Sequence, residues 1–258
     1  MTLEYKGTSI FYTDDGNGEP IVLLHGFLEN IAMWKPFLPE LSKKNRVICI
    51  DLLGHGKTGC LGYIHTMELM AETIGAVLNH LNIENPTLVG HSMGGYVSLA
   101  FAERNQDTLK GLCLLNSTPQ EDSQEKKQNR DRAIIAVKQN HKTFIRMAVA
   151  NLFSTENRTN FKTEINETIE HALKTPLQGI IAALEGMKIR KNRLKFLQNL
   201  STKKMIIIGQ KDPVLSYENL ISIIEPTNIK IIKLPDGHMS HIENKDEILH
   251  EIMYFIEK

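Results

Sequence analysis

The stretch TLVGHSMGGYVSLAF, residues 87–101, decides the fold. It joins a short apolar run to a run of small and apolar residues through the pattern G-x-S-x-G, GHSMG at 90–94. In this pattern the serine sits on a sharp turn between a strand and a helix, with its hydroxyl exposed. We therefore expect a strand, a tight turn and a helix here. Ser92 becomes a candidate nucleophile if the rest of the chain supplies a base and an acid.

Similar short apolar runs recur along the chain, and runs of this kind are typical of strands that are buried on both faces. They are PIVLLHG (20–26), RVICIDLLGHG (46–56), LKGLCLLN (109–116), KKMIIIGQKD (203–212) and IKIIKLPDGH (229–238). Helical spacing of apolar residues follows in between, as in 67–83. Strands that alternate with helices predict an α/β fold with a mostly parallel sheet flanked by helices. Active sites in such sheets lie beyond the carboxyl ends of the strands.

Two segments depart from this alternation. Residues 3–19 alternate apolar and polar side chains around Lys6-Gly7 and predict a hairpin, with Asp15-Gly16-Asn17-Gly18 as a turn. Residues 117–200 contain no strand-like run and open with the charged sequence EDSQEKKQNRDR, followed by amphipathic segments. We expect an all-helical lid at 117–200, inserted after the sixth strand, and a core formed by 1–116 and 201–258.

A serine hydroxyl stays protonated at neutral pH, so it needs a base, and the base needs an orienting partner. His238 in LPDGHMSH follows the last predicted strand and is the candidate base. Asp212 in GQKDPV follows the preceding strand and is the candidate acid. The chain order Ser92, Asp212, His238 is the order of the triad in α/β-hydrolases.

Five motifs now occur in the order of that family: LLHGF, DLLGHGKT, VGHSMGG, GQKDP and PDGHMSHIEN. The chain resembles the α/β-hydrolase fold family, in the form of a serine esterase with a helical lid. The resemblance implies an oxyanion hole formed by the backbone N–H groups of Phe27 and Met93. It also implies that His25 is a structural histidine beside the oxyanion loop.

Some residues compete for these roles. His241 lies three residues after His238, but the family places its catalytic histidine directly after glycine, so His241 is interpreted as a supporting or surface residue. Asp51 is a weak rival for the acid. Asn116 stands where some members of the family carry that acid, and an amide cannot serve, which favours Asp212.

The resemblance implies hydrolysis of a small, fairly apolar carboxylic ester through an acyl-enzyme. Apolar or sulfur-bearing side chains are expected in the pocket walls, which favours an uncharged acyl group. The candidates are Leu28, Trp34, Val214 and Met239. Ordinary core packing is an equally good interpretation of Trp34.

Composition excludes several other classes of protein. Lys plus Arg equals Asp plus Glu at 30 each, which gives no electrostatic footprint for nucleic acid or anionic lipid. No apolar run is long enough for a membrane span, and no secretory signal is visible. The three cysteines suggest no disulfide framework, so we expect a cytoplasmic protein. No metal or nucleotide motif occurs, and no cofactor is expected. The sequence leaves both a monomer and a homodimer as alternatives.

The same resemblance covers other chemistry. Cofactor-free perhydrolases, carbon–carbon bond hydrolases and lyases of menaquinone synthesis use the same triad, and some ligand sensors keep it with slow turnover. A fold and a triad cannot separate these functions. Turnover of p-nitrophenyl esters separates a working esterase from a slow sensor.

Overall fold

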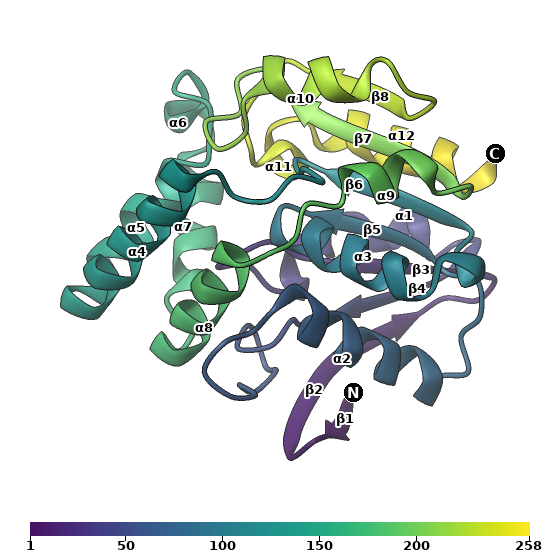
Figure 1. The fold of residues 1–258 in the computed structure, drawn as a ribbon, viewed down its shortest axis with the longest axis horizontal. Helices are drawn as coiled ribbons and strands as arrows, with labels where there is room; N and C mark the ends of the chain where they lie inside the picture. The colour runs from purple at the N-terminus through teal and green to yellow at the C-terminus, as the bar shows by residue number, and fades with distance from the viewer.

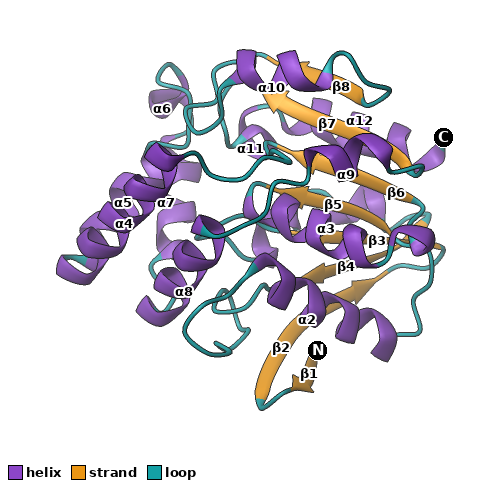
Figure 2. Cartoon of the chain, viewed as in Figure 1, coloured by secondary structure: helices purple, strands orange, loops and turns teal.

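A computed structural model describes residues 1–258, and its centre is one eight-stranded sheet (Figure 1, Figure 2). The strand order is β1-β2-β4-β3-β5-β6-β7-β8, and every pair from β4 to β8 is parallel. The predicted mostly parallel sheet flanked by helices is therefore confirmed. The strands are β1 (Thr2–Tyr5), β2 (Thr8–Asp15), β3 (Glu19–Leu24), β4 (Asn45–Ile50), β5 (Thr87–His91), β6 (Gly111–Leu115), β7 (Lys203–Gly209) and β8 (Lys230–Leu234).

The N-terminal edge of the sheet is antiparallel. β1 and β2 form a hairpin whose turn is at Lys6 and Gly7, both with positive φ. Residues 15–18 do turn the chain, but they do not close a hairpin, because β2 pairs with β4 and not with the β3 strand that follows it. The expected hairpin and the expected turn at 15–18 are thus both present, and the turn connects strands that are not neighbours in the sheet.

Helices cover both faces of the sheet and create two hydrophobic clusters. Figure 1 shows α2 and α3 in front of the sheet, and α1 and α12 behind it. The larger cluster holds buried side chains of α2 and α3, and the smaller one holds those of α1 and α12. The helices outside residues 117–200 are η1 (Ile31–Trp34), α1 (Leu38–Leu41), α2 (Met67–His80), α3 (Met93–Arg104), η2 (Gln106–Thr108), α10 (Tyr217–Ile224), α11 (Ser240–Glu243) and α12 (Lys245–Glu257).

The segment between β6 and β7 contains helices and no strand, as its amphipathic spacing predicts. Its two ends meet, since the N–H of Arg193 donates to the carbonyl of Pro119 at 2.7 Å. In Figure 1 its longer helices stand together at the left. The helices of the segment are α4 (Gln124–Gln139), α5 (His141–Ala150), α6 (Asn157–Asn160), α7 (Lys162–Ala172), α8 (Leu177–Lys188) and α9 (Leu194–Asn199), of which α9 lies beside β6 and not with the group at the left. A role as a lid stays a prediction.

Helix α8 touches the loops of the core backbone to backbone. A Cβ on Gly179 would lie closer to the carbonyl of Gly54 than any real Cβ contact, and one on Gly186 would collide with the carbonyl of His65. The N–H of His65 also donates to the carbonyl of Ala182 at 2.9 Å. Only glycine allows this approach, so α8 is fixed against the core along its length.

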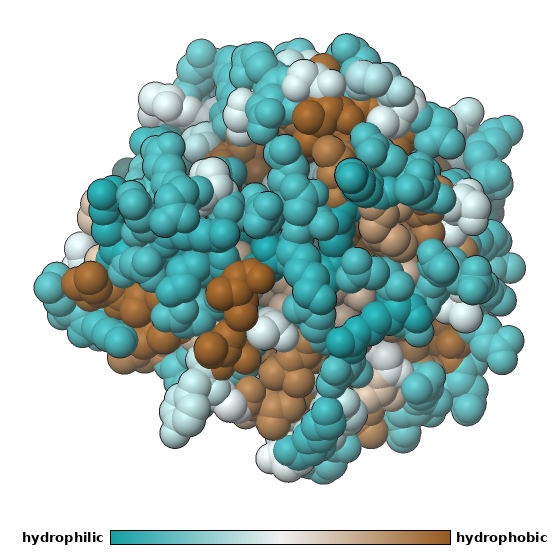
Figure 3. All heavy atoms as spheres, viewed as in Figure 1, coloured by the Kyte–Doolittle hydropathy of each residue, from teal (hydrophilic) through white to brown (hydrophobic).

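The visible face is mostly hydrophilic, with apolar patches at the left where the inserted helices lie (Figure 3). Exposed apolar side chains of that segment are Ile135, Met147, Leu177 and Ile189. None of the helices has both the length and the apolar character that a membrane span requires.

Candidate active site

Ser92 occupies a strained turn between β5 and α3. Its φ of 49° and ψ of −113° lie in a region that side chains other than glycine rarely adopt. Gly94 makes the turn sterically feasible, because a Cβ there would meet the carbonyl oxygen of Leu24 at 2.5 Å. The N–H of Ser92 donates to the carbonyl of Leu115 at 2.9 Å, which ties the turn to the next strand. The turn predicted from GHSMG is therefore present.

The structure brings the three candidate catalytic side chains together from three loops. Ser92 Oγ lies 2.8 Å from His238 Nε2, and His238 Nδ1 lies 2.7 Å from Asp212 Oδ2. Since a carboxylate only accepts, Nδ1 donates its proton to Asp212, and Nε2 is left to accept from the Ser92 hydroxyl. The arrangement is one in which a serine can lose a proton to a histidine.

Asp212 is buried, and both of its carboxylate oxygens accept hydrogen bonds. Oδ1 accepts from the N–H groups of Val214 and Leu215 at 2.8 and 2.9 Å, and Oδ2 also accepts from Asn116 Nδ2 at 3.0 Å. Burial favours the neutral carboxyl, but the charge and hydrogen bond of His238 outweigh it and hold the pKa of Asp212 below its ordinary value. Its contribution to stability is therefore present above the pKa of the unfolded chain and is lost as pH falls through the lower folded value.

The backbone N–H groups of Phe27 and Met93 donate no hydrogen bond within the protein. Met93 is the first residue of α3, where a helix offers no intrahelical acceptor. Phe27 lies in the loop after β3, and its ring contacts that of His55 at 5.9 Å between centroids. The positive end of α3 points to the same region. A developing negative charge on a bound carbonyl would be stabilised at such a place.

A cavity of roughly 100 Å³ opens beside Ser92. Core and inserted helices both contribute to its walls: Phe27, Leu28, Glu29, His91, Ser92, Tyr96, Arg130, Ala148, Leu152, Met187, Val214 and His238. Of the pocket residues expected from the sequence, Leu28 and Val214 are present. Trp34 packs against Phe37 in the cluster beneath the other face of the sheet, and Met239 is fully buried away from the cavity wall.

Glu29 and His91 form a buried pair that the sequence motifs do not reveal. His91 Nδ1 donates to Glu29 Oε2 at 2.7 Å, and His91 Nε2 donates to the carbonyl of His238 at 3.0 Å. Both partners only accept, so His91 is an imidazolium. Burial opposes this charge, but Glu29 outweighs burial and raises the pKa of His91, while the pKa of Glu29 is lowered. The same carboxylate accepts from the N–H of Gly26 at 2.6 Å. It thus links the loop of Phe27, the turn of Ser92 and the loop of His238.

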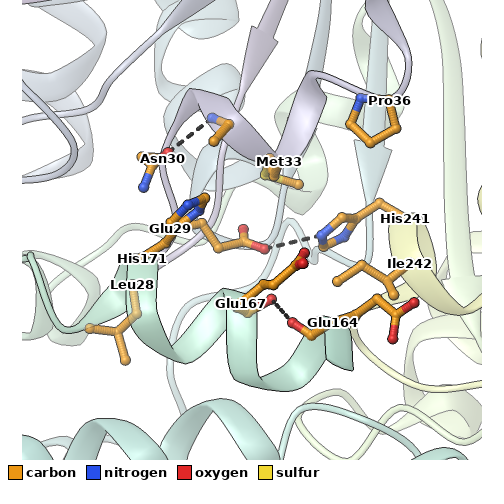
Figure 4. A pocket seen from close by; sticks show the side chains of 12 residues that line it. Leu28, Glu29, Asn30, Met33, Pro36, Glu164, Glu167, His171, His241 and Ile242 are labelled. Atoms are coloured by element: carbon orange, nitrogen blue, oxygen red, sulfur yellow. Dashed lines mark hydrogen bonds and ion pairs between the residues drawn. The ribbon is translucent and has the colours of Figure 1, made fainter. Parts of the chain in front are cut away.

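A second cavity, of roughly 170 Å³, shares Leu28 and Glu29 with the cavity of Ser92 and is shown in Figure 4. Glu29 and His241 point toward each other there, with Oε1 and Nε2 3.4 Å apart, and Glu164 and Glu167 of α7 lie opposite them. His241 is buried and not at the surface, and burial lowers its pKa to about 3. Glu29, His91 and His241 lie close enough to share a metal ion, but their ligand atoms already contact one another.

The remaining candidates have structural partners. His25 Nδ1 donates to the carbonyl of Gly26 at 2.7 Å, and its Nε2 accepts from the N–H of Leu52 at 2.9 Å. Asp51 accepts from the N–H groups of Ile31 and Lys57, both at 2.8 Å. Asp51 therefore holds a loop together and does not contact the His238 ring.

Comparison with known proteins places this arrangement in context. A family model described as alpha/beta hydrolase fold matches residues 19–245. A thermophilic esterase from Thermogutta terrifontis, solved with malate bound, has a TM-score of 0.92 and 30% identity, covering 99% of this chain and 96% of that chain. The enol-lactonase of Burkholderia xenovorans LB400 has the same TM-score of 0.92, with 21% identity and full coverage of both chains, and at that identity it shows the fold alone.

Curated relatives match over a shorter stretch. A 2-hydroxy-6-oxo-2,4-heptadienoate hydrolase of Pseudomonas putida is 37% identical over 108 residues, 40% of this chain and 39% of the relative. The acetyltransferase component of an acetoin cleaving system, also from Pseudomonas putida, is 39% identical over 100 residues, 39% of this chain and 27% of the relative. The matches thus span well under half of these relatives.

Proposed function

The chain belongs to the alpha/beta hydrolase fold family, and from that premise we propose that it is a serine hydrolase that cleaves a small carboxylic ester. The observation that carries the proposal is the continuous contact from Ser92 Oγ to His238 Nε2 and from His238 Nδ1 to Asp212 Oδ2. A serine held in this way can be deprotonated as it attacks, and the resulting imidazolium is stabilised by the carboxylate.

The reaction proceeds in two halves. Ser92 Oγ attacks the ester carbonyl while His238 takes its proton, and the N–H groups of Phe27 and Met93 stabilise the oxyanion. The tetrahedral intermediate collapses, His238 protonates the leaving alcohol, and an acyl-enzyme remains on Ser92. Water then attacks the acyl group, with His238 accepting its proton, and the free acid leaves as Ser92 is reprotonated.

A panel of p-nitrophenyl esters tests this proposal. We expect turnover of the acetate and butyrate esters and a steep loss of kcat/KM for the octanoate, because the cavity beside Ser92 holds only roughly 100 Å³. Release of p-nitrophenol is followed at pH 7 to 8 against the uncatalysed rate. Stoichiometric release without further turnover would instead identify a hydrolase-like sensor.

Carbon–carbon bond hydrolysis is the second candidate, and the Pseudomonas putida dienoate hydrolase, 37% identical over 108 residues, is the observation that favours it. The probe for this activity is a 2-hydroxy-6-oxo-2,4-dienoate of the kind that the relative's name gives. Cleavage of that compound at a higher kcat/KM than any ester of the panel would make it the main activity.

We further propose that residues 117–200 act as a lid that limits the size of the acyl group. Met187 of α8 lines the cavity and is buried, whereas Met147 of α5 is 61% exposed. We expect Met187→Ala to shift the preferred acyl chain toward longer esters and to cost about 2–5 kcal/mol of stability. Met147→Ala is the matched control and should change neither. An unchanged chain-length profile in Met187→Ala would contradict a selective role of the lid.

A further inference from the structure

A basic side chain stands in the wall of the cavity beside Ser92. Arg130 of α4 is the one permanently charged cation among the lining residues. The carboxylate among them, Glu29, already pairs with His91. An apolar acyl group gains nothing from a guanidinium in the wall, because a charged group interacts poorly with apolar surface.

The charges around Arg130 do not balance. Arg130 Nε donates to Asp122 Oδ2, and Arg190 Nη1 donates to Oδ1 of the same carboxylate at 2.5 Å. Asp122 has no exposed side-chain surface, and Arg190 lies over the ring of Tyr96 at 4.1 Å, on the cavity wall. Two guanidinium groups therefore share one carboxylate, which leaves a surplus positive charge beside the cavity.

Lys126 adds a second surplus charge on the same face of α4. It precedes Arg130 by four residues, so both side chains project from one side of the helix. Its ammonium group makes no ion pair and no hydrogen bond within the protein. It lines a neighbouring cavity of roughly 470 Å³ that shares Val214 with the cavity of Ser92. Burial and repulsion by Arg190 lower the pKa of Lys126, and they outweigh the attraction of Asp122 and Asp212, whose carboxylates already have other partners.

We propose that Arg130 and Lys126 form an anion subsite that binds a carboxylate of the substrate. The inference rests on the proposed function and names its substrate class: an ester that carries a second, ionised carboxyl group on its acyl or alcohol portion. The ester bond would lie at Ser92 and the carboxylate between the two basic side chains. The planar guanidinium can donate two parallel hydrogen bonds to a carboxylate. The lysine ammonium, on its flexible side chain, attracts the same carboxylate as a compact positive charge.

Matched ester pairs test the subsite by kinetics. For the acyl portion, p-nitrophenyl hydrogen glutarate is compared with p-nitrophenyl methyl glutarate. For the alcohol portion, p-acetoxybenzoate is compared with its methyl ester. We expect the wild-type protein to prefer the charged member of one pair. Arg130→Gln should lower that preference about 10- to 100-fold, the range for a hydrogen bond to a charged group.

Lys126→Gln should lower the preference about 3- to 10-fold, because this side chain is half-buried and partly screened. Lys127→Gln is the control, since Lys127 pairs with Glu121 at 3.8 Å outside the Ser92 cavity. The control should keep the wild-type preference. Equal preference for charged and neutral esters in the wild-type protein would overturn the inference and leave ester hydrolysis intact.

A binding measurement keeps the subsite testable without turnover. Glutarate is titrated into wild-type, Lys126→Gln and Lys127→Gln protein by calorimetry, and its affinity should fall only in Lys126→Gln and with added salt. Because Lys126 has no partner in the folded chain, this variant should fold normally. Glutarate affinity that is the same in all three proteins would overturn the subsite. Absence of any ester hydrolysis would count against the proposed function alone.

Discussion

Ser92→Ala should lower kcat on a short p-nitrophenyl ester by about six orders of magnitude, since deletion of the serine from such a triad can cost on the order of 10⁶. The side chain of Ser92 makes one contact that chemistry depends on, the 2.8 Å hydrogen bond to His238 Nε2. Without Oγ no acyl-enzyme can form, and the backbone donors alone remain. Thermal stability should change little, because alanine meets the same positive φ as serine.

Covalent labelling checks the assignment independently of rate. A fluorophosphonate should modify the wild-type protein at Ser92, identified by mass spectrometry, and should leave Ser92→Ala unmodified. Circular dichroism confirms that the variant is folded. A label on any other residue of the wild-type protein would remove Ser92 from the role of nucleophile.

Asp212→Asn should lower kcat on the same ester by about 10⁴-fold, because an amide at this position favours the wrong tautomer of the histidine. The amide of the variant could donate to His238 Nδ1, which moves the ring proton to Nε2 and removes the acceptor for Ser92. Asn116 Nδ2 donates to Asp212 Oδ2 at 3.0 Å. If the new amide nitrogen takes the place of Oδ2, two N–H donors face each other. If the amide flips to avoid this, its nitrogen takes the place of Oδ1.

Asp51→Asn is the matched control, because Asp51 is also a buried carboxylate on a loop after a strand. Its partners are the N–H groups of Ile31 and Lys57, so its replacement should reduce stability and change kcat far less. Steady-state kinetics on both variants decides the matter. A nearly active Asp212→Asn beside an inactive Asp51→Asn would reverse the assignment.

Local patterns predict the strands, the turn at Ser92 and the parallel part of the sheet, because continuous apolar runs and the G-x-S-x-G spacing act within a few residues. The pairing of β2 with β4 could not be predicted in this way, since nothing in 8–15 specifies its partner. Trp34 shows the same limit. Its apolar character predicts burial correctly, but periodicity does not say which face of the sheet it covers.

The pair of Glu29 and His91 could not be predicted because it joins the loop after β3 to the last residue of β5, 62 residues away, with no motif at Glu29. Arg130 had a usable signal. It lies in a charged run that suggests a solvated surface, yet its spacing of four from Lys126 places both on one face of a helix. Only the fold shows that Arg130 lines the cavity of Ser92 and that Lys126 lines the neighbouring cavity.

The close contact of α8 with the core limits how far this helix could move away from the cavity beside Ser92. A lid that opens as a hinge needs an edge that can separate from the core. Helix α8 offers no such edge, because its backbone at Gly179 and Gly186 packs directly on the backbone of the loops at Gly54 and His65. We therefore expect α8 to keep its position relative to the core. The side after α5 is held by backbone as well, since the N–H of His238 donates to the carbonyl of Leu152 at 3.0 Å. Space for a larger substrate would therefore come from movement of side chains in the cavity wall, such as Met187, and not from separation of whole helices.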